Sequence, residues 1–131
     1  MVSDPIADLL VRLKNAARRK HAVTTIPYSQ LKEKILEILI QDGFVTAITR
    51  RGRKTNRRLE VALGYDGANE PRLHDAQRIS RPGRRLYAKA REVRAPRYGR
   101  GVTVLSTPQG LMSHRDAKVK RAGGEVLFEI W

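Results

Sequence analysis

The strongest structural signal in the chain is an aliphatic stripe at helical spacing that ends just before a hairpin pattern. Four aliphatic residues recur at intervals that place them on one helix face: Leu31, Ile35, Ile38 and Leu39. Ser29 is placed to cap the N-terminus of this helix, and Gly43 is placed to end it. The spacing therefore predicts a helix between these two residues, with one face packed on a core.

An earlier helix is predicted at the start of the chain. Ser3 or Asp4 can cap it, and Pro5 suits the first helical position. Its apolar positions form one stripe, made of Ile6, Leu9, Leu10, Leu13 and Ala17. Its polar positions fall on the opposite face and are Asp8, Arg12, Asn15 and Arg19. This helix is expected to pack on one side and to present basic and amide groups on the other.

Strand patterns accompany both helices in the first half. Residues 23–26, 44–49 and 58–63 are β-prone, and the last two runs flank a basic loop at 50–57 that contains no acidic residue. The order is helix, strand, helix and hairpin, so residues 1–64 are predicted to form an N-terminal α+β domain.

The second half is predicted to be mainly antiparallel β with one short helix. Residues 65–72 are typical of a linker, which leaves 73–131 as a second small domain. Residues 106–110 are expected to form a loop. Ser113 with Asp116 resembles a capping box for the helix, which Gly123 and Gly124 would end. The expected strands are 73–80, one beginning at 85–88, 102–105 and 125–131. The fold class is therefore α+β with two small domains.

Charge narrows the choice of partner. The chain has 27 Lys and Arg, of which 19 are Arg, against 13 Asp and Glu, giving a net charge of +14. Arg presents a planar fork that suits phosphate, and a chain this basic repels itself unless a polyanion neutralises it. Residues 50–58 hold 6 cations and no anion, and residues 78–100 hold 9 cations against Glu92 alone. Tyr87 and Tyr98 interleave the second run, where a ring can stack on an unpaired base, although Tyr87 can equally pack in the sheet.

The sequence lacks the residue patterns that several other classes of protein require. The chain has no Cys, which excludes disulfides and cysteine-based metal or redox chemistry. No apolar run approaches the roughly 20 residues of a membrane span, and Asp4 and Asp8 interrupt the apolar start that a signal peptide needs. A basic membrane-surface protein would need large aromatics opposite Lys on a helix, which neither helix has. Scattered His and the absence of a Walker loop or nucleophile elbow lead us to expect no catalytic residue, metal or cofactor. We therefore expect an intracellular nucleic-acid binder.

Five blocks of sequence carry a family resemblance. They occur in order as SDPIADLL at 3–10, RISRPGRRLY at 78–87, LST at 105–107, GLM at 110–112 and GGEVL at 123–127. Arg12 and Asn15 follow the first block. Together the blocks resemble the S-eight family of small-subunit ribosomal proteins. Pro108 stands where that family usually has a second serine, and Phe128 stands where a cysteine is frequent.

The resemblance implies a structural constituent of the small ribosomal subunit without enzymatic activity. It implies direct and early binding to the central domain of small-subunit ribosomal RNA, and a role in assembling the platform. It also implies two α+β domains, contacts with two neighbouring small-subunit proteins (the fifth and the twelfth), and a location in cytoplasmic ribosomes. A free-standing regulator that binds a hairpin resembling the ribosomal site stays open as an alternative, and a nuclease is a more distant one.

The resemblance also implies a set of site residues. The surface that recognises an irregular RNA hairpin would consist of Ser106, Thr107, Gly110, Gly124 and Glu125, with Tyr87 and Arg85 beside it. The N-terminal domain would contact RNA through Asp4, Arg12, Asn15, Ser29 and Lys32. Hydroxyls can pair with a base edge or a ribose, glycines permit close backbone approach, and a carboxylate can accept from an amino group or a 2′-hydroxyl. The alternative for Glu125 is an anchor that orients the loop through backbone amides.

Overall fold

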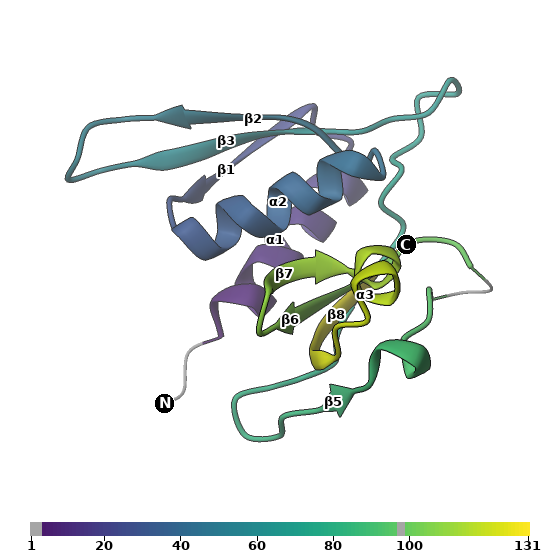
Figure 1. The fold of residues 1–131 in the computed structure, drawn as a ribbon. Coiled ribbons are helices and arrows are strands. Elements are labelled where there is room, and N and C mark those ends of the chain that lie inside the picture. Colours follow the sequence, from purple (N-terminus) through teal and green to yellow (C-terminus); the bar gives the residue numbers. More distant parts are fainter. Residues whose placement is uncertain (1–3, 97–98) are drawn as a thin grey trace. The chain divides into compact units, whose positions relative to one another are not determined.

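The computed structural model describes residues 4–96 and 99–131, which form two compact units (Figure 1). One unit is Pro5–His74, and the other consists of Asp75–Trp131 together with Asp4. Ser3 and Tyr98, which carried two of the expectations above, lie outside the described residues. Each unit combines helix with antiparallel sheet, so the predicted α+β class is confirmed. No described helix is long and apolar enough to cross a membrane.

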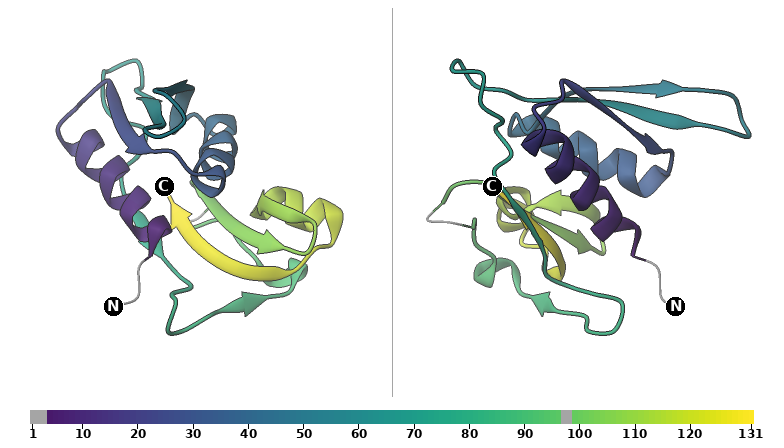
Figure 2. Two further views of the ribbon diagram at one scale, coloured as in Figure 1. Left: turned by 90° about the vertical axis from the view of Figure 1, so that its left-hand side faces the viewer. Right: turned by 180° about the vertical axis from the view of Figure 1, so that it is seen from behind.

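The first unit is a three-stranded sheet with two helices on one face (Figure 2). The strands pair antiparallel in the order β1-β3-β2, and β3 alternates between buried and outward residues as a half-buried strand should. The elements in chain order are α1 (Pro5–Arg18), β1 (Val23–Pro27), α2 (Gln30–Gln41), β2 (Val45–Arg51) and β3 (Arg58–Leu63).

Both helices follow the predicted patterns closely. The apolar stripe of α1 is buried and its predicted polar face is exposed. Ser29 caps α2 by accepting a hydrogen bond from the Lys32 amide at 3.0 Å, and Gly43 follows the helix with φ +80°. The packed face of α2 differs from the prediction in two residues, because Leu36 is buried whereas Leu31 is exposed.

Residues 65–72, expected to be a linker, contain a hydrogen-bonded turn. The Asp66 carboxylate accepts from the amides of Ala68 and Glu70 at 2.8 and 3.0 Å, and Tyr65 pairs with Pro71 in an isolated bridge. The Tyr65 hydroxyl donates to the His21 carbonyl at 2.5 Å. The predicted domain limits, 1–64 and 73–131, stay predictions.

The second unit is a five-stranded sheet covered by short helices. Its main path is β4-β8-β6-β7, and β5 pairs with the start of β8. Leu105, Met112 and Ala117 are the centre of a buried cluster that joins the sheet to α3. The elements in chain order are β4 (Ala76–Arg78), β5 (Tyr87–Ala88), η1 (Ala90–Glu92, a 3₁₀ helix), β6 (Val102–Thr107), β7 (Gly110–Ser113), α3 (His114–Lys120) and β8 (Gly124–Ile130).

The structure corrects two expectations about loops in this unit. Residues 106–110 are not one loop, since Ser106 and Thr107 end β6, Gly110 begins β7, and only Pro108 and Gln109 form the turn. Helix α3 is capped by Ser113, as predicted, but Arg121 ends it in the left-handed conformation at φ +52°. Gly124 instead belongs to β8, where the chain must pass close to β6.

Candidate RNA interface

Three predicted site residues form a row across neighbouring strands of the second unit. Ser106 on β6 and Tyr87 on β5 both pair directly with Glu125 on β8. Directly opposed residues of antiparallel strands point to the same face, with Cβ atoms about 5 Å apart. Tyr87 is 72% exposed, so its ring is free to stack on a flat ligand. We call Ser106, Glu125 and Tyr87 the strand row.

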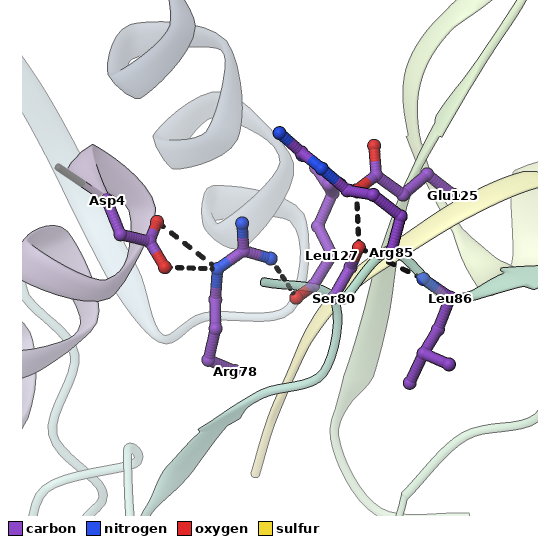
Figure 3. A network of polar contacts seen from close by, with 7 residues as sticks. All are labelled: Asp4, Arg78, Ser80, Arg85, Leu86, Glu125 and Leu127. Carbon is purple, nitrogen blue, oxygen red and sulfur yellow. Dashed lines mark hydrogen bonds and ion pairs between the residues drawn. The ribbon is translucent and has the colours of Figure 1, made fainter. Parts of the chain in front are cut away.

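Glu125 is held in place by side chains from the segment before β5 (Figure 3). Its Oε2 accepts from the Ser80 hydroxyl and from the Arg85 guanidinium, the latter at 3.0 Å. The Ser80 hydroxyl in turn accepts from the Leu86 amide at 3.2 Å. Glu125 is thus anchored by two side chains, and both its predicted contact with RNA and its alternative role in orienting the loop stay predictions.

The anchor also sets the protonation state of Glu125. Partial burial raises the pKa of its carboxyl group, but the hydrogen bonds from Ser80 and Arg85, together with the charges of Arg85 and Arg78, lower the pKa by more. The pKa of Glu125 is therefore held below its ordinary value. The strand row contains a fixed carboxylate at neutral pH, which can accept hydrogen bonds but cannot donate one.

Ser80 and Arg78 are residues that reasoning from the sequence did not assign to the site. Ser80 is fully buried beneath Glu125, and Arg78 contacts the Asp4 carboxylate at 3.1 Å and the Leu127 carbonyl at 2.5 Å. Both lie in the RISRPGRRLY block, which was the only sequence signal for them. Asp4, a predicted RNA contact, is thus engaged by an arginine whose own side chain is 10% exposed.

Thr107 and Gly110 build the turn next to the strand row. The Thr107 hydroxyl donates to the Gly110 carbonyl at 2.9 Å and accepts from the Gln109 amide at 3.1 Å, and Thr107 is buried. Gly110 adopts φ +114°, a conformation that favours glycine. The Thr107 hydroxyl thus has a donor and an acceptor inside the turn, so Ser106 is the hydroxyl better placed to meet a ligand.

Gly124 allows two strands of the protein itself, β8 and β6, to lie close together. A Cβ atom at this position would lie 2.1 Å from the Ser106 carbonyl oxygen. The glycine thereby allows β8 to pass close to β6 and brings Glu125 opposite Ser106. Its predicted role, close approach of an RNA strand, stays a prediction.

The remaining predicted residues lie in the first unit. Arg12 and Asn15 are exposed on the polar face of α1, as expected. Ser29 and Lys32 lie at the start of α2, where the Ser29 hydroxyl caps the helix. Both Ser29 and Lys32 are half-buried.

The basic hairpin of the first unit contains internal ion pairs. Arg50 makes a two-pronged contact with Glu33, with both N–O distances at 2.6 Å, and lies over the Tyr28 ring at 5.3 Å from its centroid. Arg57 lies at 5.6 Å from the same centroid. The Glu33 pKa is lowered, with the Arg50 hydrogen bond as the largest cause. Arg50, predicted in the loop, is in β2 and is already neutralised.

The geometry of the strand row can be explained without a metal ion. No group of three or more His, Asp or Glu in the described parts of the chain could hold a metal ion. The arrangement offers a flat ring, a hydroxyl and a fixed carboxylate on one sheet face, with cations around them. These are groups that bind an irregular nucleic acid through hydrogen bonds and stacking.

Comparison with known proteins supports the same family as the five sequence blocks. The family model described as Ribosomal protein S8 matches residues 4–131. The chain is 43% identical over 130 residues to a protein of Mycoplasmopsis agalactiae named small ribosomal subunit protein uS8, covering 99% of this chain and 98% of the relative. Proteins with the same name from Dictyoglomus thermophilum and Sorangium cellulosum are 41% and 40% identical, over 98% and 100% of their lengths. These matches span both units, and the chain belongs to the ribosomal protein S8 family, whose members are structural, non-enzymatic components of the ribosome.

Proposed function

We propose that this chain is a constituent of the small ribosomal subunit that binds the central domain of small-subunit ribosomal RNA directly. The observation that carries the proposal is the strand row, in which Ser106, Glu125 and Tyr87 share one face of the second sheet. The net charge of +14 adds a general attraction to the RNA backbone. The strand row adds contacts that only distorted RNA can make, because a regular duplex keeps its bases stacked and paired.

The chemistry of the row suits distorted RNA. A-form helices hide their major groove, so a protein recognises their shape, their 2′-hydroxyls and the bases that leave the stack. The Tyr87 ring can stack on such a base, and Ser106 can donate to or accept from a base edge. Glu125 can accept from an amino group or a 2′-hydroxyl, and its position is fixed before the RNA arrives.

The finer assignment follows the family to which the chain belongs. On this basis we propose that the protein binds early, helps to organise the platform of the subunit, and touches the fifth and twelfth small-subunit proteins in cytoplasmic ribosomes. Arg12, Asn15, Ser29 and Lys32 would supply the contacts of the first unit with RNA.

The test is a footprint of the full chain on purified small-subunit RNA, with a competition between the protected hairpin and a regular duplex. We expect protection confined to an irregular hairpin of the central domain, and preference for that hairpin over the duplex. Protection spread evenly over the RNA would contradict the proposal. Co-sedimentation with small subunits distinguishes it from a free-standing regulator, which would bind the hairpin without entering the subunit.

A further inference from the structure

A cleft lined by cations lies between η1 and α3 in the second unit. It has a volume of about 540 Å³ and is lined by Lys89, Ala90, Arg91, Lys118 and Arg121. Four of these five residues are cationic, and none is acidic. We call this surface the basic cleft. It is distinct from the strand row, and none of its residues was among the predicted site residues.

Helix capping explains why some of these cations occur at the cleft, but not all of them. Lys118 lies in the last turn of α3 and Arg121 caps its C-terminus, where a cation is favoured by the helix dipole. That explanation does not extend to Lys89, which precedes η1. Glu92, in η1, accepts a hydrogen bond from the Lys89 backbone amide at 2.9 Å. Within the described residues, no ion pair neutralises the four cations of the cleft.

The cleft adjoins the strand row through the backbone. Ala88 on β5 pairs with Gly124, next to the Tyr87 and Glu125 pair, and Lys89 follows Ala88 directly. A Cβ atom on Gly123 would lie 2.7 Å from the Ala88 carbonyl oxygen and 3.0 Å from the Lys89 Cα. Two residues of extended chain span about 7 Å, so the cleft begins within about that distance of Tyr87.

We infer that the basic cleft holds the phosphodiester backbone of the RNA strand whose bases or riboses contact the strand row. This inference rests on the proposed function and adds a second subsite to it. Four cations around one concave surface match phosphate charge, and two of them are Arg, whose fork contacts two phosphate oxygens at once. The volume is large enough for a phosphate with part of its sugar, because ligand pockets typically measure about 300–1,000 Å³.

The test compares two double variants of the full chain with equal loss of charge. Arg91→Gln with Lys118→Gln removes two cleft cations, and Arg94→Gln with Lys120→Gln removes two exposed cations from neighbouring positions that do not line the cleft. Binding is measured to the irregular hairpin over a range of salt concentrations. We expect the cleft variant to bind roughly tenfold more weakly and its salt slope to fall by about two, with a clearly smaller change in the matched control.

Equal changes in the two variants would overturn the inference while leaving RNA binding by the unmodified protein intact. Failure of the unmodified protein to prefer the hairpin would instead contradict the proposed function. A second arm replaces single hairpin phosphates by neutral methylphosphonates. One such replacement should weaken binding of the unmodified protein and the control, but not of the cleft variant; if none does, the inference fails.

A third arm identifies the source of the phosphate. Inorganic pyrophosphate is titrated into the unmodified protein in the presence of excess hairpin. We expect the RNA to displace pyrophosphate from the cleft. Pyrophosphate that stays bound beside the RNA would show that the cleft serves a free polyphosphate, and would overturn the inference.

Discussion

The basic hairpin of the first unit and the strand row of the other unit both involve strongly basic stretches of sequence, but they differ in which charges are neutralised. The hairpin belongs to a run with 6 cations and no acid, yet Glu33 and Glu60 neutralise Arg50 and Arg51 from outside that run. The segment around Tyr87 is also basic, but there Arg85 holds one acid, Glu125, on the sheet face that carries Tyr87. A count of charges along the sequence therefore does not reveal which charges are available to a partner.

The largest expected effect concerns the backbone that supports the strand row. Gly124→Ala places a Cβ atom 2.1 Å from the Ser106 carbonyl oxygen, so β6 and β8 must separate. We expect a loss of about 3 kcal/mol in the free energy of unfolding, at the upper end of overpacking costs. Denaturant unfolding measures it. Gly67→Ala is the matched control in the first unit, because an added Cβ there meets nothing within 4 Å; similar losses in both variants would contradict the argument.

A smaller effect is expected from the anchor of Glu125. Ser80→Ala leaves the Leu86 amide and the Glu125 Oε2 each without one buried partner, at a cost of about 2 kcal/mol in the free energy of unfolding. It should also weaken preference for the irregular hairpin over a duplex, because the carboxylate is no longer fixed. A stability loss with unchanged preference would show that Glu125 acts within the fold only.

The anchor also predicts a pH dependence. A carboxyl group whose pKa is lowered by folding stabilises the protein above its unfolded pKa, near 4.3, and this stabilisation disappears as pH falls through the folded pKa. Glu125 has its pKa lowered in this way. Ser80→Ala should therefore lessen the loss of stability between neutral and acidic pH, measured by denaturant unfolding at several pH values. A pH profile parallel to that of the unmodified protein would contradict the prediction.

The two hydroxyls at the end of β6 should differ in what they affect. Thr107→Ala removes both turn hydrogen bonds and should lower the free energy of unfolding by about 1 kcal/mol. Ser106→Ala should leave stability unchanged and reduce preference for the irregular hairpin by about 0.5–1.5 kcal/mol. Competition titration and denaturant unfolding of both variants separate the two roles. Loss of preference only in Thr107→Ala would reverse the assignment.

The smallest expected effect is in the hairpin of the first unit. Arg53→Gln with Lys54→Gln should lower the salt slope of RNA binding by about one per lost phosphate contact. Arg50→Gln with Arg51→Gln should lower it less, because these arginines are shared with Glu33 and Glu60. Both variants should keep their preference for the irregular hairpin over a duplex. An equal or larger change in slope from Arg50 and Arg51 would show that their ion pairs with Glu33 and Glu60 do not keep them from phosphate.

Local patterns predicted much of the fold because they report local physics. Ser29 and Ser113 were expected to cap helices, and their hydroxyls accept the hydrogen bonds that a cap requires. The loop at 106–110 was predicted wrongly in extent, since Pro108 and Gly110 signal a turn without showing how short it is. Strand register, which reduced this loop to two residues, depends on a partner strand elsewhere in the chain.

For the candidate site, the sequence assigned a group of residues, and the structure shows how some of them are arranged. Ser106, Glu125 and Tyr87 were assigned together through the family blocks, and their pairing across three strands gives that group a geometry. Ser80 was not assigned, because nothing near it in the sequence indicates that its hydroxyl meets a residue 45 positions away. The roles of Asp4, Thr107 and Gly124 within the fold likewise depend on atoms contributed by other elements.

By itself, then, the sequence determined the helices, most strands, the excess of positive charge and the family, since each of these follows from residue type and spacing along the chain. Only the tertiary structure decided which cations are neutralised, how Glu125 is fixed, and that η1 and α3 line a basic cleft. The physical reason is that hydrogen bonds and ion pairs act over a few ångströms between atoms. The residues that supply those atoms are brought together by strand pairing and helix packing, not by their order in the chain.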